Sequence, residues 1–179
     1  MNSYEINNDT LAILPLNEYK SKVIEKTKTF VVDLTPMKII ENSCAYFGSS
    51  YQGRFLGTKN LIGISHKAPI IIEESREIIF FPTNSPRIYE CAWISLKNLQ
   101  NYKKGKDNTT IIFNNGHLLN LDISYGSLDN QVLRAARLES VLRLRKNNNF
   151  LFRVQYFICV SCIISVTPFA KNFNRLRKV

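Results

Sequence analysis

The amino-acid sequence predicts an α+β fold: a β-rich single domain with one helix near residues 36–47 and another near residues 127–146. Short runs of β-branched and aromatic residues, bounded by Asn, Asp, Gly or Pro, recur along residues 10–123 and are typical of strands. Two segments instead place apolar residues at helical spacing. With 179 residues and a hydrophobic fraction of 45%, the chain is long enough to bury the core of one domain.

The first third of the chain predicts three strands followed by a helix. The strand signals lie at residues 10–15, 22–25 and 29–34. Pro36 suits the first turn of a helix, where an N–H group is not needed, and apolar residues recur at helical spacing from Met37 to Phe47. Because glycine is common just after the end of a helix, we expect this helix to end at Gly48.

The middle of the chain predicts further strands and one hairpin. The strand signals are at residues 61–65, 69–73, 77–81 and 91–95. The strongest hairpin signal joins residues 109–113 to residues 117–123. The Asn-Gly pair that ends at Gly116 lies between these two runs, and it suits a tight turn that requires positive φ.

A second helix is predicted after the hairpin. Ser127 is a suitable N-cap, and an apolar stripe follows it at helical spacing. The stripe consists of Leu128, Val132, Ala135, Leu138 and Leu142. We expect the Asn triplet at residues 147–149 to end the helix, so that residues 1–146 form the domain and residues 147–179 an atypical basic tail that is neither a clean helix nor an alternating strand.

The net charge of +10 and the pI of about 9.6 predict an anionic partner, either nucleic acid or an anionic membrane surface. The charge is unevenly distributed. Residues 146–179 contain six basic residues and no acidic residue, whereas the preceding 145 residues contain 18 basic and 14 acidic residues. Much of the basic character therefore belongs to the tail.

The cysteine content and the N-terminus indicate a reducing, cytoplasmic location. Four cysteines do not make a disulfide framework in a chain of this length, and the N-terminus lacks the basic and apolar regions of a signal peptide. Residues 154–170 carry no charge, but they include several polar residues and a proline, and a membrane span needs about 20 predominantly apolar residues. We do not expect this run to span a membrane.

The glycine-rich block that begins at Gly48 narrowly misses two catalytic motifs. Gly48 and Gly53 have the spacing of a phosphate-binding P-loop, but Arg54 and Phe55 stand where that loop requires Lys and then Ser or Thr. The block also has one residue too many for the G-x-S-x-G turn of serine hydrolases. The spacing therefore indicates neither nucleotide hydrolysis nor a serine nucleophile.

The cysteines and histidines do not predict a metal site. Zinc ligands usually come in pairs two to four residues apart. Here Cys44, His66, Cys91 and His117 are separated by 22, 25 and 26 positions, which is more typical of two core thiols and surface histidines. Cys159 and Cys162 have the spacing of a redox motif, but nothing around them indicates a βαβ unit. We expect no metal, no cofactor and no small-molecule substrate.

Four aromatic residues are interspersed with two basic residues over residues 46–59, a combination suited to nucleic-acid phosphates and bases. They are Tyr46, Phe47, Tyr51 and Phe55, with Arg54 and Lys59. The same region carries a series of motifs that resembles the ComK family of competence transcription factors of Gram-positive bacteria. The motifs are Cys44-x2-Phe47-Gly-Ser-Ser-Tyr51-x-Gly53-Arg54-x2-Gly57-Thr58, Ile64-Ser-His-Lys67-x-Pro69-Ile70, Phe80-Phe-Pro-Thr83, Cys91-x-Trp93-Ile-Ser95, Ile123-Ser-Tyr125 and Asn130-Gln-Val132. The resemblance covers roughly residues 3–145.

This resemblance implies a sequence-specific transcriptional activator of DNA-uptake genes that binds double-stranded DNA at paired A/T-rich boxes. It implies binding largely through the minor groove, by a self-associating protein located at the nucleoid. The narrow, strongly negative minor groove of A-tracts favours inserted Arg or Lys side chains. Family members continue with a charged helical region and an aromatic Phe-Met-Leu-Tyr-Pro element that a proteolytic adaptor recognises, and this element is absent here. The tail resembles sequence from another reading frame or an interrupted gene, so we expect impaired activity and doubtful adaptor binding.

We expect eight residues to form the DNA-binding surface. The predicted phosphate or minor-groove contacts are Arg54, Lys59, His66, Lys67 and Arg76, and the residues predicted to shape the adjoining loop are Ser49, Ser50 and Tyr51. Two alternatives stay open. One is a basic protein that associates with a membrane surface through residues 150–170, and the other is a hydrolase in which His66 activates Ser49 or Ser50.

Overall fold

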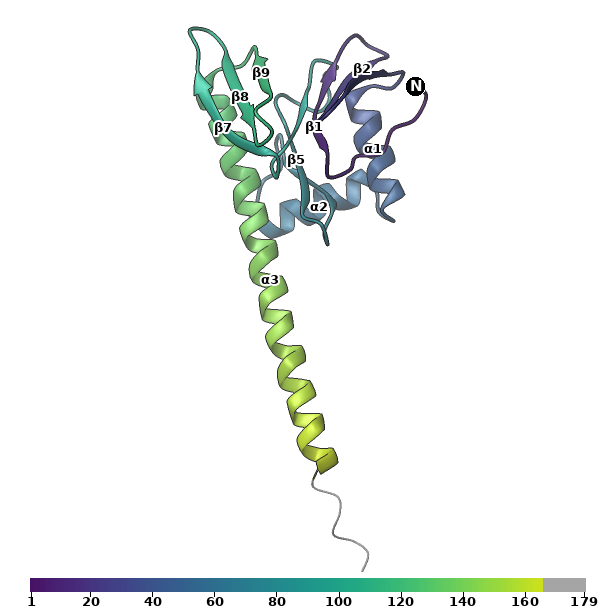
Figure 1. Ribbon diagram of the computed structural model, residues 1–179, viewed down its shortest axis with the longest axis vertical. Helices are drawn as coiled ribbons and strands as arrows, with labels where there is room; N and C mark the ends of the chain where they lie inside the picture. Colours follow the sequence, from purple (N-terminus) through teal and green to yellow (C-terminus); the bar gives the residue numbers. More distant parts are fainter. Residues whose placement is uncertain (166–179) are drawn as a thin grey trace, which may run out of the picture. The chain divides into compact units, whose positions relative to one another are not determined.

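The computed structural model describes the backbone of residues 1–165 and the side chains of residues 1–147. Its contacts divide the chain into two units, Met1–Val141 and Leu142–Val179, and helix α3 (Tyr125–Ser165) begins in the first unit. The first unit also holds two antiparallel sheets and the helices α1 (Pro36–Tyr46) and α2 (Tyr51–Ile62) (Figure 1). Within the described part of the chain, no helix is both long enough and apolar enough to cross a bilayer.

All neighbouring strands of both sheets pair in antiparallel fashion. The larger sheet contains, in spatial order, β3 (Thr29–Val32), β2 (Ser21–Glu25), β1 (Thr10–Pro15), β6 (Trp93–Ser95), β5 (Ile78–Pro82) and β4 (Ile70–Glu73). The smaller sheet contains β7 (Leu99–Lys104), β8 (Thr109–Phe113) and β9 (Leu118–Leu121). Strand β6 therefore joins the N-terminal hairpin to the β4–β5 hairpin at the centre of the larger sheet.

The larger sheet is buried on both faces. Ile13 and Trp93 are register partners on β1 and β6, and with Phe80 they lie in one buried cluster with residues of α1. Helix α1 contacts β1 and β4, and α2 contacts β4, so the two helices cover this face. Phe81 and Ile94 are register partners that point to the opposite face, and both are fully buried. Burial on both faces explains why these strands show continuous apolar runs.

The first part of α3 is tied to both sheets by side-chain hydrogen bonds. Tyr102 on β7 donates from its hydroxyl to Asp129 at 2.5 Å. Gln131, which is 3% exposed, donates from its amide to the carbonyl of Pro82 at the end of β5, at 2.7 Å. Three residues of the predicted apolar stripe, Leu128, Ala135 and Leu138, are fully buried.

The structure confirms the α+β class and most of the predicted elements. The strand signals at residues 10–15, 22–25, 29–34, 69–73, 77–81, 91–95, 109–113 and 117–123 correspond to β1, β2, β3, β4, β5, β6, β8 and β9. The helix predicted at residues 36–47 corresponds to α1, and Gly48 follows it with a φ of +72°. In addition, the β8–β9 hairpin turns at Gly116 with a φ of +82°.

Two predictions around α2 are wrong. The segment from Tyr51 is a helix and not a loop, and the strand predicted at residues 61–65 does not form, because residues 61–62 are the last turn of α2. The sequence did not predict this helix, because it contains two internal glycines and shows only a weak apolar periodicity. Gly63 then ends α2 in the left-handed conformation, with a φ of +74°.

Three further differences concern β7 and α3. Strand β7 was not predicted, because its sequence, LQNYKK, is mostly polar. The N-terminal cap of α3 is Ser124, whose hydroxyl accepts a hydrogen bond from the Ser127 amide at 3.3 Å, so Ser127 lies inside the helix. The Asn triplet at residues 147–149 does not end α3, and the backbone stays helical to residue 165, because low helix propensity is only a weak constraint on a long helix.

Candidate nucleic-acid interface

The start of α2 is built by the serines of the glycine-rich block. The Ser49 amide donates to the carbonyl of Cys44 at 3.0 Å, which turns the chain after α1. Ser50 is the N-cap of α2, and its hydroxyl accepts a hydrogen bond from the amide of Gly53 at 3.0 Å. The first turn of α2 contains no acidic residue, so no carboxylate of this turn neutralises the positive end of the helix dipole.

The first turns of α2 carry an aromatic group that connects the surface to the core. Tyr51 stacks on Phe55, with ring centroids 6.3 Å apart, and packs edge-on against Trp93 at 6.4 Å. Burial raises the pKa of Tyr51 above its usual value, so its hydroxyl stays protonated. Tyr51 therefore offers a neutral donor and acceptor beside an apolar wall.

The loop between α2 and β4 is held in place at both ends. The buried hydroxyl of Thr58 donates to the carbonyl of Pro69 at 3.1 Å. From α3, Arg134 donates to the carbonyl of His66 at 3.0 Å. Between these anchors Lys67 adopts a φ of +47°, a left-handed conformation that is uncommon outside glycine and that costs about 1 kcal/mol. The exposed side chains of His66 and Lys67 are therefore presented by a fixed backbone.

A second loop, between β5 and β6, faces this first loop. It is closed by two hydrogen bonds between Thr83 and Ala92, one between the backbones at 2.9 Å and one from the Ala92 amide to the Thr83 hydroxyl at 3.1 Å. Cys91 donates to the carbonyl of Asn84 at 3.4 Å. Arg87 lies exposed in this loop. The prediction from sequence missed Arg87, although it follows the Phe80-Phe-Pro-Thr83 motif by four residues.

A pocket of about 410 Å³, which we name the basic pocket, opens where α1, α2 and these two loops meet. The residues that line it are Met37, Tyr51, Gln52, Phe55, Ser65, His66, Lys67, Ala68, Ser85, Pro86 and Arg87. No acidic residue lines the pocket. Among residues 1–147, neither Lys67 nor Arg87 forms an ion pair, so both positive charges are free to attract an anion.

The structure brings most of the predicted site residues to this region. Tyr51, His66 and Lys67 line the basic pocket, and Ser49 and Ser50 lie at the adjoining start of α2. Lys59 is exposed in the last turn of the same helix. Arg54 is half-buried, and its Nε is buried without a hydrogen-bond partner.

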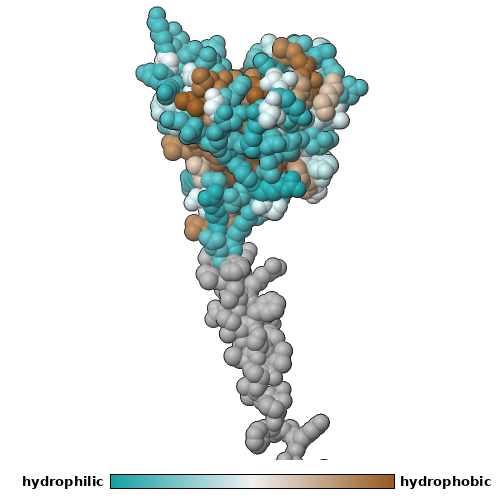
Figure 2. All heavy atoms as spheres, viewed as in Figure 1, coloured by the Kyte–Doolittle hydropathy of each residue, from teal (hydrophilic) through white to brown (hydrophobic). Residues whose placement is uncertain are grey.

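Hydrophilic residues cover most of the molecular face that Figure 2 shows, and hydrophobic residues there form separate small patches.

Arg76 lies apart from the other predicted residues. Both loops of the basic pocket adjoin one end of the β4–β5 hairpin, whereas Arg76 is in the turn at the other end, about 13 Å away along four residues of strand. Its guanidinium lies 3.8 Å from the carboxylate of Glu73. Its carbonyl accepts a hydrogen bond from Lys97 at 3.0 Å.

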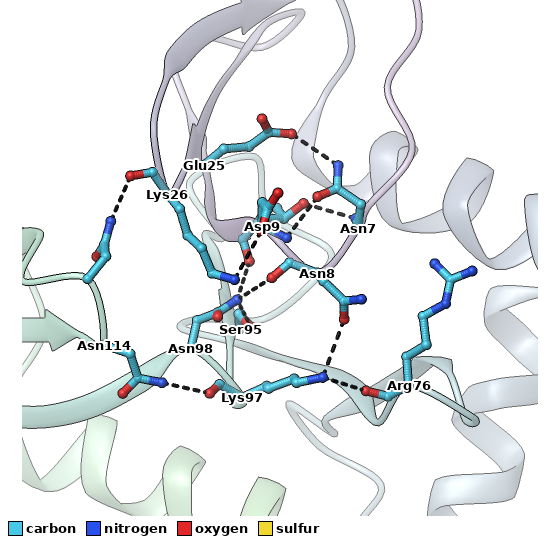
Figure 3. A network of polar contacts seen from close by, with 12 residues as sticks. Asn7, Asn8, Asp9, Glu25, Lys26, Arg76, Ser95, Lys97, Asn98 and Asn114 are labelled. Carbon is cyan, nitrogen blue, oxygen red and sulfur yellow. Dashed lines mark hydrogen bonds and ion pairs between the residues drawn. The ribbon is translucent and has the colours of Figure 1, made fainter.

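Arg76 thus belongs to a polar network that links the two sheets (Figure 3). Lys97 also donates to the side chain of Asn8 at 3.4 Å. Asn98, which is 5% exposed, donates to the carbonyls of Asn8 and Thr10 and to the Ser95 hydroxyl at 3.0–3.2 Å. On the same side, Lys26 forms an ion pair with Asp9 at 3.0 Å. We name these residues, together with Asn7, Glu25 and Asn114, the polar network.

The structure gives no support to the hydrolase alternative, and it buries two of the cysteines. Cys44 and Cys91 are buried in the core, and burial raises the pKa of both thiols to about 11. Within residues 1–147, no three His, Cys, Asp or Glu side chains are close enough to hold a metal ion. The Ser50 hydroxyl accepts the capping bond of α2 and makes no hydrogen bond to His66. The proposed membrane-surface segment, residues 150–170, has its side chains outside the described residues, as does the redox-spaced pair that begins at Cys159.

Comparison with known proteins identifies the family. The family described as ComK protein matches residues 1–147. Over 162 residues the chain is 39% identical to the competence transcription factor of Bacillus subtilis (strain 168), and the alignment covers 88% of this chain and 84% of that protein. No solved structure matches the chain. The family is that of a transcription factor, which is not an enzyme, and both findings support a competence transcriptional regulator. The chain therefore belongs to the ComK family.

Proposed function

We propose that this chain is a sequence-specific activator of competence genes that binds A/T-rich boxes of double-stranded DNA, largely through the minor groove. The observation that carries the proposal is the basic pocket, where Lys67 and Arg87 have no carboxylate partner among the described residues and face the start of α2. Family membership supports the role in transcription.

The chemistry of this surface suits DNA. Binding of a cationic side chain to a phosphate releases counterions, so each such contact adds affinity that weakens with salt. The minor groove of A/T-rich DNA is narrow and strongly negative, and it favours inserted Arg or Lys side chains over base-edge contacts. The two exposed loops offer such cations, and the start of α2 adds the positive end of a helix whose first turn has no acidic residue. No acidic residue lines the pocket between them.

Each predicted residue has a role in the proposal. His66 and Lys67 from the loop, and Arg54 and Lys59 from α2, contact phosphates or the groove. Tyr51 shapes the surface beside them. Ser49 and Ser50 hold the start of that helix toward the DNA. Contact of Arg76 with DNA also stays a prediction, and it requires a duplex that passes along the whole β4–β5 hairpin.

Paired boxes are best bound by more than one copy of the chain, so the proposal includes self-association at the DNA. Sedimentation velocity with and without a two-box duplex measures it. A complex with a single copy on both boxes contradicts this part. The predictions about the proteolytic adaptor and about impaired activity concern residues 147–179, and they stay predictions.

The test is fluorescence anisotropy with two labelled duplexes of equal length, one with paired A/T-rich boxes and one G/C-rich. We expect at least about tenfold tighter binding to the A/T-rich duplex. We also expect a minor-groove ligand such as distamycin to displace the protein. Equal affinity for both duplexes at every salt concentration overturns the proposal of sequence-specific binding.

A double variant tests the surface itself. Lys67→Gln combined with Arg87→Gln removes two charges from the basic pocket without removing the side-chain stems. We expect the dependence of log affinity on log salt to become shallower by about 2. Lys22→Gln, an exposed lysine on β2, is the matched control and should leave the slope unchanged. An unchanged slope in the double variant places the DNA elsewhere.

A further inference from the structure

We propose that the basic pocket is a binding site for a single nucleotide, with its phosphate held by Lys67 and Arg87 and its base against the apolar wall formed by Tyr51 and Phe55. This inference goes beyond the proposed function, because a free nucleotide can occupy the pocket without any DNA. The shared chemistry is a phosphate linked through a sugar to a flat base, and its source is either a free nucleotide or one nucleotide of a strand.

The size and lining of the pocket suit such a ligand. Its volume of about 410 Å³ falls in the range of small-molecule sites, about 300–1,000 Å³. One part of its wall is aromatic and apolar, formed by Tyr51, Phe55 and Met37. The other part carries cations and hydroxyl groups. This division matches a nucleotide, which has a flat apolar face at one end and an anion at the other.

The charge of the pocket matches one phosphate group. A phosphate monoester carries about −1.5 to −2 charges near neutral pH. Lys67 and Arg87 supply two positive charges, no acidic residue lines the pocket, and neither cation has an ion pair within the described residues. The Ser85 hydroxyl accepts a hydrogen bond from the Arg87 amide at 3.4 Å, which leaves its proton free to donate to a phosphate oxygen.

The pocket is also formed before any ligand binds. Arg134 and Thr58 hold the His66–Pro69 segment by hydrogen bonds to its carbonyls. Lys67 is kept in a strained left-handed conformation, a feature that accumulates at ligand sites, where the surrounding structure enforces it. Because the loops are already ordered, binding a small ligand does not cost their conformational entropy.

The single tryptophan gives a direct readout. Trp93 is fully buried, and its ring lies perpendicular to that of Tyr51 with the centroids 6.4 Å apart. A ligand that packs on Tyr51 should therefore change the fluorescence of Trp93. The experiment titrates the full chain with each of the four 2′-deoxynucleoside 5′-monophosphates, and in parallel with inorganic phosphate and with the matching nucleosides. We expect saturable binding of at least one monophosphate, at least about tenfold tighter than phosphate alone or nucleoside alone. Absence of saturation, or equal binding of inorganic phosphate, overturns the inference.

Variants show whether the signal comes from this pocket. Lys67→Gln with Arg87→Gln should weaken the monophosphate about tenfold or more and should leave the affinity for the nucleoside within about twofold. Lys22→Gln should leave both affinities unchanged. The thermal unfolding midpoint of each variant establishes that it is folded. If the folded double variant binds the monophosphate as tightly as the unmodified chain, the pocket is not the site.

Competition identifies the source of the nucleotide. If the monophosphate displaces the A/T-rich duplex and inorganic phosphate at the same concentration does not, a nucleotide of the strand uses the pocket in the DNA complex. If both bind together, the pocket serves a free nucleotide, and Lys67 and Arg87 do not contact the DNA. The two proposals also fail separately: duplex binding without monophosphate binding removes the nucleotide site alone, and monophosphate binding without duplex binding removes the proposed DNA function alone.

Discussion

The two ends of the β4–β5 hairpin carry similar residues that have opposite surroundings. At the turn end, Arg76, Lys97 and Lys26 are engaged by Glu73, by carbonyl and amide oxygens, and by Asp9. At the other end, Lys67 and Arg87 line a pocket without an acidic residue. The first group satisfies charge within the protein and connects two sheets. The second group leaves positive charge available to an anion from outside.

This difference shows what a count of basic residues cannot show. A surface ion pair contributes only about 0–1 kcal/mol to stability, but it neutralises the field that an anionic ligand would feel. Cations in the polar network, Arg76 included, should therefore add less affinity for an anionic ligand than cations without partners. Cations without partners keep their field, and α2 adds its positive helix end beside them.

A substitution in the polar network, at the turn end of the hairpin, should have the largest effect on stability. Asn98→Ala removes three hydrogen bonds of a side chain that is nearly inaccessible to solvent. We expect the free energy of unfolding to fall by about 2–4 kcal/mol, as measured by urea denaturation. Asn114→Ala is the matched control, because that exposed side chain donates a single bond to the Lys97 carbonyl, and it should cost less than about 1 kcal/mol. Equal losses would mean that the network does not act through buried bonds.

Two arginines at opposite ends of the β4–β5 hairpin should contribute differently to DNA binding. Arg87→Gln should lower the affinity for the A/T-rich duplex about tenfold at moderate salt, because it removes a cation without an internal partner. Arg76→Gln should lower it less than about twofold, because Glu73 already screens that charge. Fluorescence anisotropy on both variants measures the difference. A larger loss for Arg76→Gln reverses our assignment of the DNA surface.

Removal of the N-cap of α2 should have a moderate effect on the free energy of unfolding. Ser50→Ala removes the hydroxyl that caps the Gly53 amide and should lower the free energy of unfolding by about 1 kcal/mol. Ser49→Ala is the control, because the bond of Ser49 to Cys44 comes from its backbone amide and survives the substitution. Thermal or urea unfolding checks both variants, and a loss confined to Ser49→Ala would contradict the assigned cap.

Two substitutions at Lys67 should have the same effect on DNA affinity but different effects on stability. Lys67→Gly relieves the left-handed backbone at a φ of +47° and should raise the free energy of unfolding by about 0.5–1 kcal/mol, while it weakens DNA binding. Lys67→Gln removes the same charge but keeps the strain, so it should weaken binding equally without the gain in stability. If the two variants unfold with the same midpoint, the strain at this position is absorbed elsewhere.

Titration of Glu25, in the polar network, should make a small contribution to the pH dependence of the free energy of unfolding. Burial tends to raise the pKa of Glu25, but hydrogen bonds from Asn7 and Tyr4 and the nearby Lys28 ammonium together lower it. The unfolded state therefore takes up this proton first on acidification. The free energy of unfolding should fall as the pH drops below the usual value of 4.5 and through the folded-state pKa. Urea denaturation at a series of pH values should show a shallower decline for Glu25→Gln, and an unchanged decline excludes Glu25 as a source.

Local sequence patterns predicted the parts of the fold in which local and tertiary preferences agree. Pro36 and Gly48 bracket α1 as expected, and the Asn-Gly pair at Gly116 turns the β8–β9 hairpin. The same reasoning missed α2, because its two internal glycines lower helix propensity, and it missed the mostly polar strand β7. Contacts of α2 with β4 and pairing of β7 with β8 stabilise these elements from outside the local sequence.

The candidate site divides in the same way. Residue types and their spacing were enough to predict the family, the basic character and the motif residues near α2, because these are local properties of the chain. They did not predict that Arg87 joins Tyr51, His66 and Lys67 at one pocket while Arg76 lies in the polar network. Strand pairing places these residues, because an antiparallel hairpin brings the residues before and after it to one end and its own turn to the other. Whether a cation meets a carboxylate or an open pocket depends on that placement.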